Sequence, residues 1–374
     1  MKTWFFTETA YPYLPESYES IRVILPNGIY NPRVGAELYH RYIDEWVYAE
    51  EMGLEIMLNE HHQTATCLDP AAPIMLGILA RETSKSRLLI LGNPIANRRQ
   101  PVRVAEEMAM IDNLSRGRLE VGFVRGVPYE ISAMNSNPVR MSERFWEAHD
   151  LIMKTWATHD GPFNWEGRYY HHREVNIWPR PYQEPHPPVW ITSLSPGSAG
   201  RIAEHRYVVA TFLTGFDGSM RIFNAYRETA AETGWEAPND RFAYAALVYT
   251  GETDEEGFAG ARKLMWYIES NRVAPQFISP PGYIPAATAA KMMRQGSSLY
   301  RYNKPTLDDL ISQGIVFAGN PDTVFKQIKR LYDHNGGFGH LLVMGQAGFL
   351  DHRETTRGID LLAKEVYPRL KELN

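Results

Sequence analysis

Hydrophobic positions along the chain alternate between short continuous apolar runs and longer segments in which they recur every three or four residues. The short runs indicate buried strands, and the longer spacing indicates helices that pack on one side. In one helical segment, Val104, Met108 and Ile111 fall on a single stripe. Eight short runs qualify as strands: Thr3–Thr7, Glu55–Leu58, Leu88–Leu91, Leu119–Phe123, Val189–Ser193, Tyr207–Phe212, Phe242–Tyr249 and His340–Met344.

Helical segments separate these runs, and several begin with a polar residue followed by proline. Proline suits the first helical position, where its missing N–H is not needed. Strands that alternate with helices predict a parallel β/α architecture, and eight strands are the number that closes a (β/α)8 barrel. An open doubly wound sheet is the alternative. The predicted helix starts are Asp69-Pro70, Gln100-Pro101, Ser195-Pro196 and Asn320-Pro321.

Two stretches interrupt this alternation, and we interpret both as insertions within one domain that spans residues 1–374. Asp160 to Pro188 is rich in aromatic residues, His and Pro, and Asn271 to Pro305 contains the sequence APQFISPPGYIP. Long loops within a compact domain are usually functional or disordered. We expect insertions at the carboxyl face of the barrel, with residues 271–305 as a mobile lid without regular structure.

Composition excludes several classes of protein. The 374 residues are 44% hydrophobic and 22% charged, which is ordinary for a globular chain, and a net charge of -5 gives no basic footprint for nucleic acid. No apolar run approaches the roughly 18 residues of a membrane helix. The start, MKTWFFTETAYPYLP, resembles a first strand more than a signal peptide. Cys67 is the single cysteine, so no internal disulfide forms and the cytoplasm is the expected compartment.

The polar segment Asn59-Glu60-His61-His62 follows the second predicted strand directly. Barrels place their active sites at the carboxyl ends of strands, and a histidine there can move a proton near neutral pH. A solvated strand end is an equally good interpretation of the segment alone. Neighbouring residues of an extended chain point to opposite faces, so we do not expect His61 and His62 to share a metal ion.

Three further segments at strand ends carry binding chemistry. The third strand ends in Gly92-Asn93-Pro94, where glycine permits close approach of a ligand, although a plain turn explains it too. The fourth strand delivers Arg125 to its carboxyl end, and Arg144 follows in the next helical segment; arginine grips phosphate with two hydrogen bonds. Arg118 lies at the opposite end of that strand, where we expect a structural ion pair.

The fifth strand runs into Ser193-Leu194-Ser195-Pro196-Gly197-Ser198. A serine-capped helix start offers free N–H groups and hydroxyls to an anion, and together with the two arginines it suggests a phosphate pocket. The sequence contains no GxGxxG after a strand, no GxxxxGK[ST] and no GxSxG. These absences disfavour a Rossmann dehydrogenase, a nucleotide triphosphatase and an α/β-hydrolase.

Three segments in order resemble the bacterial luciferase-like flavin-dependent monooxygenases: AEEMGLEIMLNEHH, PVRVAEEMAMIDNLSRGRLEVGFVRG and PVWITSLSPGSAGRIAEH. The resemblance spans about Ala49 to Arg206, with a weaker match at Gly319–Met344. It implies a (β/α)8 barrel, usually dimeric, that binds FMN at the carboxyl ends of its strands. The implied reaction uses reduced FMN and O2, through a flavin C4a-hydroperoxide, to oxygenate a small organic substrate.

The resemblance also implies roles for individual residues. His61 matches the active-site histidine, and Gly92-Asn93 matches a non-prolyl cis peptide bond under the flavin ring. Arg125 and Arg144 match the two phosphate-binding arginines, although one residue is inserted between them. The helix-terminal part of the phosphate site corresponds to Leu194, Ser195 and Ser198, where Leu194 replaces an acidic residue and leaves its backbone N–H as the ligand.

The sequence departs from luciferase at Val124, which stands where luciferase has a reactive cysteine. Absence of a dinucleotide fingerprint, together with the resemblance, implies a separate NAD(P)H:flavin reductase as a partner. A homodimer is expected for the same reason. Two alternatives remain open at this point: an oxidoreductase of the same fold that uses the deazaflavin F420, and a flavin-binding protein without catalysis.

Overall fold

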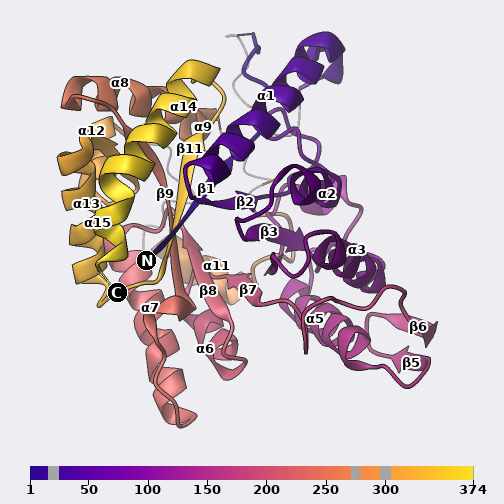
Figure 1. Ribbon diagram of the computed structural model, residues 1–374. Helices are drawn as coiled ribbons and strands as arrows, with labels where there is room; N and C mark the ends of the chain where they lie inside the picture. Colours follow the sequence, from indigo (N-terminus) through magenta and orange to yellow (C-terminus); the bar gives the residue numbers. More distant parts are fainter. Residues whose placement is uncertain (16–24, 271–276, 278, 295–304, 374) are drawn as a thin grey trace.

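The computed structural model describes residues 1–15, 25–270, 277, 279–294 and 305–373. Within these ranges the strands form a ring and the helices lie around it (Figure 1). The chain therefore has the layered arrangement of a barrel, with one core inside the ring of strands and another between strands and helices.

Eight parallel strands of the described chain pair in the order β9-β11-β1-β2-β3-β4-β7-β8, and β8 pairs with β9 to close the ring. This closure confirms the predicted (β/α)8 barrel and excludes the open sheet. All eight predicted runs are strands of the ring. Their bounds are β1 Lys2–Thr7, β2 Glu55–Leu58, β3 Leu88–Pro94, β4 Leu119–Val124, β7 Val189–Thr192, β8 Val208–Phe212, β9 Phe242–Thr250 and β11 His340–Gln346.

A further strand, β10 (Val316–Gly319), escaped the sequence analysis. It pairs with the carboxyl half of β9, from Leu247 to Thr250, on the edge where β8 pairs with the amino half. The run is four residues long and passes directly into a helix start at Asn320-Pro321, so hydrophobic periodicity has too few positions to register it.

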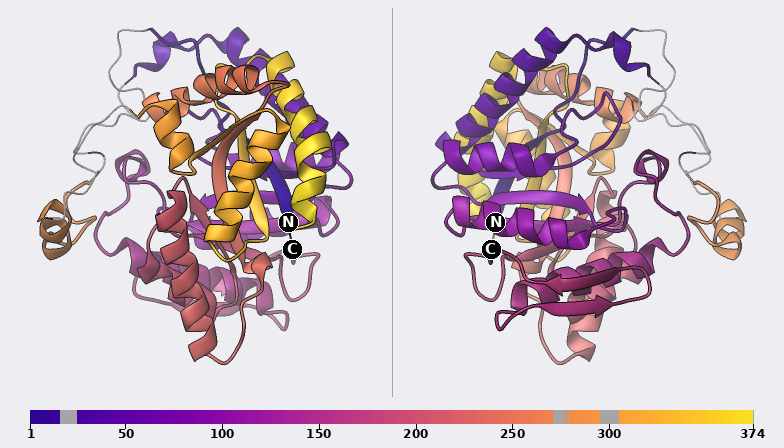
Figure 2. Two further views of the ribbon diagram at one scale, coloured as in Figure 1. Left: turned by 90° about the vertical axis from the view of Figure 1, so that its left-hand side faces the viewer. Right: turned by 90° about the vertical axis from the view of Figure 1, so that its right-hand side faces the viewer.

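The helices run back along the outside of the ring (Figures 1 and 2). Within the described residues, none of them is both long and apolar enough to cross a membrane. Their bounds are α1 Pro32–Glu51, α2 Ala72–Glu82, α3 Pro101–Leu114, α4 Glu130–Ala133, α5 Met141–Ala157, α6 Pro196–Glu204, α7 Gly215–Glu232, α8 Asp254–Leu264, α9 Trp266–Ser270, α11 Ala286–Arg294, α12 Leu307–Ser312, α13 Pro321–His334, α14 His352–Leu361 and α15 Tyr367–Lys371, with single turns at η1 Asn27–Ile29 and η2 Asn239–Arg241 and a π-helical turn at η4 Leu362–Val366.

Three predicted helix starts are confirmed, at Pro101, Pro196 and Pro321. Asn320 caps the last of these, because its side chain accepts the N–H of Thr323 at 3.0 Å. The start at Asp69-Pro70 was wrong, since α2 begins at Ala72. Asp69 is buried rather than exposed at a helix end, and its carboxyl group belongs to the polar cluster described below.

The predicted insertion at residues 160–188 lies between α5 and β7 and contains an antiparallel hairpin, β5 (Phe163–Glu166) and β6 (His171–Val175). Glu147 of α5 holds the turn of this hairpin, because its carboxylate accepts the backbone N–H groups of Arg168, Tyr169 and Tyr170. A second carboxylate of α5, Glu143, accepts from the guanidinium of Arg168 and the hydroxyl of Tyr169, so two acidic residues fix the hairpin to α5.

Only part of the second insertion, 271–305, is described, and residues 271–276, 278 and 295–304 lie outside the described residues. The expectation of no regular structure was wrong for the part that is described, because α11 (Ala286–Arg294) is helical. Its sequence AATAAKMMR contains neither Gly nor Pro, which cluster before it. Figure 2 shows α11 standing away from the ring of strands.

Aromatic side chains fill the amino end of the barrel. Trp4, Trp190 and His340 pack edge to face, with ring centroids 5.4 Å apart for the two tryptophans and 4.6 Å apart for Trp190 and His340. Trp4 Nε1 donates to His340 Nδ1 at 3.1 Å, and Trp190 Nε1 donates to Glu120 at 2.6 Å. Burial lowers the pKa of His340 to about 3, so this histidine is neutral.

Arg118, at the amino end of β4, has the structural role that was expected but a different set of partners. Its guanidinium donates to the backbone carbonyls of Ala80, Thr83, Ser86 and Ser115 and to the hydroxyl of Thr83. Within the described residues it forms no ion pair. A guanidinium has five N–H donors, which suit a site lined by carbonyl oxygens. If Arg118 were paired with a carboxylate, these carbonyl oxygens would lack their donor.

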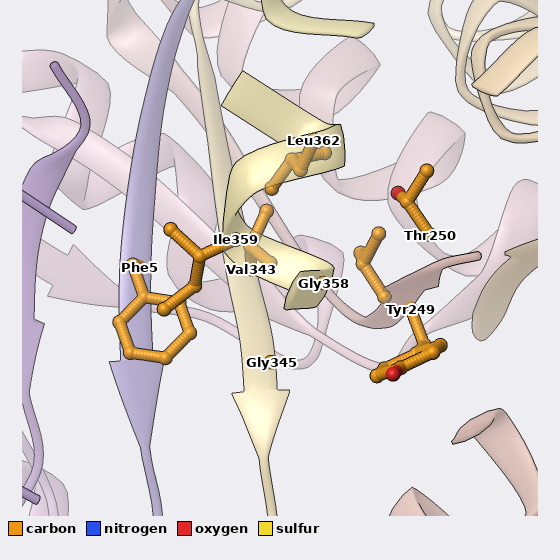
Figure 3. Close-up of a pocket in the computed structure, with 9 residues that line it drawn as sticks. Phe5, Tyr249, Thr250, Val343, Gly345, Gly358, Ile359 and Leu362 are labelled. Atoms are coloured by element: carbon orange, nitrogen blue, oxygen red, sulfur yellow. The ribbon is translucent and has the colours of Figure 1, made fainter. Parts of the chain in front are cut away.

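A small cavity of about 10 Å³ lies on the outer side of the barrel wall, beneath α14 (Figure 3). Side chains of β1, β9 and β11 line it together with Ile359 and Leu362. It is barely large enough for one water molecule. A larger ligand does not fit there.

Candidate active site

The residues singled out from the sequence lie at the carboxyl ends of β2, β3, β4 and β7, which are consecutive neighbours in the ring. Because the strands are parallel, these ends lie along one side of the same rim. The structure therefore gathers His61, Gly92, Arg125 and Ser195 on one arc of the barrel mouth. Arg144 follows at the start of α5.

His61 is held by groups that follow β4. Its Nδ1 lies 2.9 Å from Oε1 of Glu130 and 3.1 Å from the hydroxyl of Tyr129. The same oxygen of Glu130 accepts the backbone N–H of His62 at 2.9 Å. Glu130 and Tyr129 did not emerge from the sequence analysis. In the sequence, they are an aromatic and an acidic residue shortly after Arg125. Hydrophobic periodicity alone does not distinguish them as site residues.

A second carboxylate holds the neighbouring histidine. Glu60 Oε1 lies 2.8 Å from His62 Nε2 and also accepts from the guanidinium of Arg98. Glu60 is fully buried, whereas a quarter of the Arg98 side chain remains exposed. The side chains of His61 and His62 thus turn to different carboxylates.

Polar atoms without a partner gather around Glu60. Glu60 Oε2, Asp69 Oδ2, Arg98 Nε and both amide atoms of Asn97 are buried and have no hydrogen-bond partner within the described residues. Burial and the nearby charge of Glu60 raise the pKa of Asp69 to about 8, so this acid is protonated at neutral pH. Buried polar atoms are nearly always paired, so this part of the rim has capacity for polar groups of a ligand.

The irregular end of β3 corrects one prediction. The cis peptide bond joins Leu91 and Gly92, one residue before the predicted Gly92-Asn93 bond, and Asn93-Pro94 is not among the cis bonds of the described residues. Asn93 has already returned to the sheet, where it pairs with Phe123 after a register shift that begins at Ile90. The cis bond thus lies within this register shift.

Glycine is required at this position because β3 and β4 approach closely. A Cβ on Gly92 would lie 2.3 Å from Cγ1 of Val124, and one on Gly122 would lie 2.4 Å from Leu91. Asn93 is fully buried, and its amide donates to the carbonyl of Gly122 beside Met108 of α3. Its side chain faces the helix layer, so only its backbone is placed to meet a ligand at the mouth.

Arg125 is exposed at the end of β4 and contacts the second insertion. Its guanidinium donates to the hydroxyl of Tyr283 and lies over that ring, with Cζ 4.7 Å from the centroid. Tyr283 belongs to the described part of residues 271–305. This contact locates that segment at the carboxyl rim.

Arg144 turns to its own loop instead. It donates to the carbonyl of Asn137 and to the hydroxyl of Ser136, and its Nε is buried without a partner within the described residues. Burial holds the pKa of its guanidinium below the usual value, but the group stays charged. Arg125 and Arg144 share no hydrogen-bond partner in the described chain, so the structure does not unite them as a pair.

The turn into α6 is organised by Ser193 rather than Ser195. Ser193 Oγ lies 2.6 Å from Ser198 Oγ and accepts the N–H of Ser195 at 3.4 Å, while the Ser195 side chain makes no capping bond. The expectation that Ser195 caps the helix was therefore wrong. Leu194 is 69% exposed, which leaves its backbone accessible. The first turn of α6 remains open to an anion.

Comparisons with known proteins agree with this geometry. The luciferase-like monooxygenase family matches residues 21–337. The oxygenase component of a flavin-dependent trigonelline monooxygenase from Acinetobacter baylyi is 28% identical over 166 residues, which cover 43% of this chain and 45% of that protein. A 3,6-diketocamphane 1,6-monooxygenase from Pseudomonas putida is 22% identical over 87% of this chain and 91% of its own length. The chain spans about half the length of the first curated relatives it matches.

Solved structures share the fold across nearly the whole chain. Monooxygenase RslO1 from Streptomyces bottropensis superposes with a TM-score of 0.76 at 21% identity and covers 99% of this chain and 100% of its own. The oxygenating constituent of the Pseudomonas putida 3,6-diketocamphane monooxygenase, in complex with FMN, has a TM-score of 0.72 at 19% identity, with 98% of both chains covered. An F420-dependent secondary alcohol dehydrogenase has a TM-score of 0.67 at 17% identity and covers 90% of this chain and 95% of its own. With a barrel of this kind and a family match across most of its length, the chain belongs to the luciferase-like monooxygenase family.

Proposed function

We propose that this protein is a monooxygenase that takes reduced FMN and O2 and oxygenates a small organic substrate. The observation that carries the proposal is the placement of His61. It lies at the end of β2 with Nδ1 against a buried carboxylate, on the same arc as Arg125 and the open first turn of α6. A histidine held in this way can exchange a proton beside a bound ligand.

The residues of the rim fit the two ends of FMN. Arg125 and the start of α6, with the backbone of Leu194 and the hydroxyls of Ser195 and Ser198, would hold the phosphate. Arg144 is the weaker candidate, because its Nη2 bonds its own loop and its Nε is buried. Unpartnered polar atoms at Asn97 and Arg98 suit the polar edge of the flavin ring.

Reduced flavin, when bound, supplies the two electrons that activate O2. The protein has to hold the ring beside Gly92, keep water out and provide a proton. Phe6, Leu91 and Phe212 belong to the apolar interior of the barrel and would form the bottom of the flavin site. His61 would hold or move the proton at Nε2.

The proposed partners are a separate NAD(P)H:flavin reductase and a second copy of this chain. Apolar side chains exposed on the neighbouring helices α2 and α3, Ile74, Ile78, Met110 and Leu114, form a face that suits a homodimer. The reductase is tested by mixing the protein with FMN and NADH or NADPH without oxygen. Rapid bleaching of the flavin without added reductase would rule out the two-component scheme.

The cofactor is tested by titrating the protein with FMN, reduced FMN and F420 and then measuring oxygen uptake with reduced FMN. We expect binding of FMN and oxygen uptake above that of free flavin. The likeness to an F420-dependent dehydrogenase makes F420 the second candidate. Tight binding of F420 with no affinity for FMN would replace the proposal, and binding of FMN without any effect on its oxidation would indicate a non-catalytic flavin protein.

A further inference from the structure

Glu130 joins two loops of the candidate active site. It is the first residue of α4, its side chain is 1% exposed, and its Oε1 meets both His61 Nδ1 and the backbone N–H of His62. Gln63 adds a third bond, from its amide to the carbonyl of Ala133 at 3.2 Å. The loop after β2 is therefore docked on α4 through His61 and the two residues that follow it.

The charge of Glu130 determines which ring nitrogen of His61 carries a hydrogen. Burial raises the pKa of the Glu130 carboxyl, but the charge and hydrogen bond of His61 and the N–H of His62 outweigh it and hold this pKa below its usual value. The carboxylate is ionised at neutral pH and can only accept hydrogen bonds. His61 Nδ1 must then carry a hydrogen, which leaves Nε2 as the nitrogen that gains and loses a proton.

The other polar groups around His61 do not determine which of its ring nitrogens carries the hydrogen. Tyr129 places its hydroxyl 3.1 Å from the same Nδ1, and Asp69 contributes its backbone carbonyl, which accepts the N–H of His61 at 3.4 Å. The carboxyl of Asp69 is protonated at neutral pH, and the carboxylate of Glu60 is paired with Arg98 and with His62 Nε2. Among the described residues Glu130 has no Lys or Arg as an ion-pair partner, so its charge acts on His61.

We propose that Glu130 is a positioning residue that fixes His61 as the Nδ1–H tautomer and orients its ring, so that Nε2 exchanges the proton of the reaction. The carboxylate does not touch the substrate in this scheme. The catalytic consequence rests on the proposed function, whereas the tautomer of His61 does not. The two can therefore fail separately.

Nuclear magnetic resonance of the protein labelled with 15N-histidine tests the tautomer directly. Long-range 1H–15N spectra distinguish Nδ1–H from Nε2–H, and the signals of His61 are those that disappear in His61→Gln. We expect the Nδ1–H form of His61 above its pKa. An Nε2–H form in the wild-type protein would overturn the proposal, and this result requires neither flavin nor substrate.

Glu130→Gln keeps the shape of the side chain but removes its charge. We expect this variant to lower the pKa of His61, mix its tautomers and slow kcat by at least about tenfold, with little change in KM. Glu147→Gln is the matched control, because Glu147 also holds a loop through backbone N–H groups but lies away from His61. It should leave kcat and the His61 signals unchanged.

Combining the variants separates positioning from a structural role. Glu130→Gln/His61→Gln should be no slower than His61→Gln, because both changes remove one function. Additive losses, or a Glu130→Gln protein with the wild-type tautomer and pKa of His61, would overturn the proposal. If the wild-type protein has no activity with reduced FMN, the proposed function fails while the tautomer of His61 still decides this inference. If Glu130→Gln does not fold, the wild-type spectrum decides it.

Discussion

Arg118 and His340 at the amino end of the barrel differ from a cluster of polar side chains at its carboxyl end in how completely their buried atoms are paired. At the amino end, Arg118 donates five hydrogen bonds and His340 has a partner on each ring nitrogen. At the carboxyl end, polar atoms of Asp69, Asn97 and Arg98 are buried without partners in the described chain. Saturated groups stabilise a fold, whereas unsatisfied ones cost stability unless a ligand meets them.

The two histidines show the same contrast. His340 is enclosed by Trp4 and Trp190, and its low pKa keeps it neutral throughout the physiological range. His61 is partly exposed, and its Nδ1 lies 2.9 Å from the carboxylate of Glu130. One ring is a fixed part of the core, and the other lies at the rim, where we propose that it exchanges a proton.

The largest expected effect is on catalysis, from a change at the carboxyl end. His61→Gln should lower kcat by about 100- to 10,000-fold, the usual contribution of a general acid or base, while folding and flavin binding persist. Oxygen uptake and circular dichroism measure the two properties. His171→Gln, on the exposed hairpin, is the control. Unchanged turnover in His61→Gln would give His61 a purely structural role.

A change at the amino end should lower stability and leave catalysis unchanged. Arg118→Ala leaves four carbonyl groups without their donor, so we expect about 3 kcal/mol less free energy of unfolding, with kcat per folded molecule unchanged. Urea denaturation measures it. Arg103→Ala, which removes an exposed pair with Glu107, should cost less than about 1 kcal/mol. Equal losses in both variants would remove the contrast between the two ends.

Affinity for the phosphate of the cofactor should depend on Arg125. A charge-assisted hydrogen bond contributes roughly 1.5–3 kcal/mol, so Arg125→Ala should weaken FMN binding by about tenfold or more. Riboflavin, which lacks the phosphate, is the control ligand and should bind both proteins alike. Fluorescence titration gives both constants. An equal loss for riboflavin would show that Arg125 contacts another part of the flavin.

The smallest effect is on the pH dependence of stability. Asp69 has a folded-state pKa of about 8, above its ordinary value of about 3.8, so the folded protein holds a proton that the unfolded chain releases. This acid makes the free energy of unfolding fall as pH rises from about 4 to about 8, by up to about 1.4 kcal/mol per pH unit. His340 acts oppositely, because its lowered pKa makes stability fall as pH drops from about 6.5 to about 3.

Between about pH 6.5 and 8 the contribution of Asp69 is no longer opposed by His340. Asp69→Asn should therefore lose less stability than the wild-type protein over this interval, by about 1–2 kcal/mol in urea denaturation. The same slope in both proteins would show that Asp69 is already ionised below pH 6.5.

The strands, and the residues that follow them at the rim, were predictable because buried strands have a recognisable apolar sequence. The runs that formed the ring, such as Leu88–Leu91, are apolar on both faces, as a strand between a core and a helix layer must be. His61, Gly92, Arg125 and Ser195 follow such runs, so their place at the rim came from topology alone. The family match supports the same architecture.

The contacts within the site were less predictable, because they depend on how loops fold back. Nothing in the segment after Arg125 shows that Glu130 turns toward His61 rather than to solvent. The cis bond was misplaced by one residue because the register shift that sets its position arises between two strands. Ser193 replaced Ser195 as the organiser of its turn for a similar reason, since only the local geometry decides which hydroxyl meets the N–H.

The pairing of β1 has a consequence for synthesis on the ribosome. β1 pairs with β2 at only two positions, Trp4 with Glu55 and Phe5 with Ile56, but with β11 at six positions, from Lys2 with His340 to Thr7 with Gln346. β1 is thus secured mainly by a strand that is synthesised long after it. Its apolar side chains must wait for all the elements between β1 and β11, and such long-range closure makes folding slow and exposes the nascent barrel to aggregation.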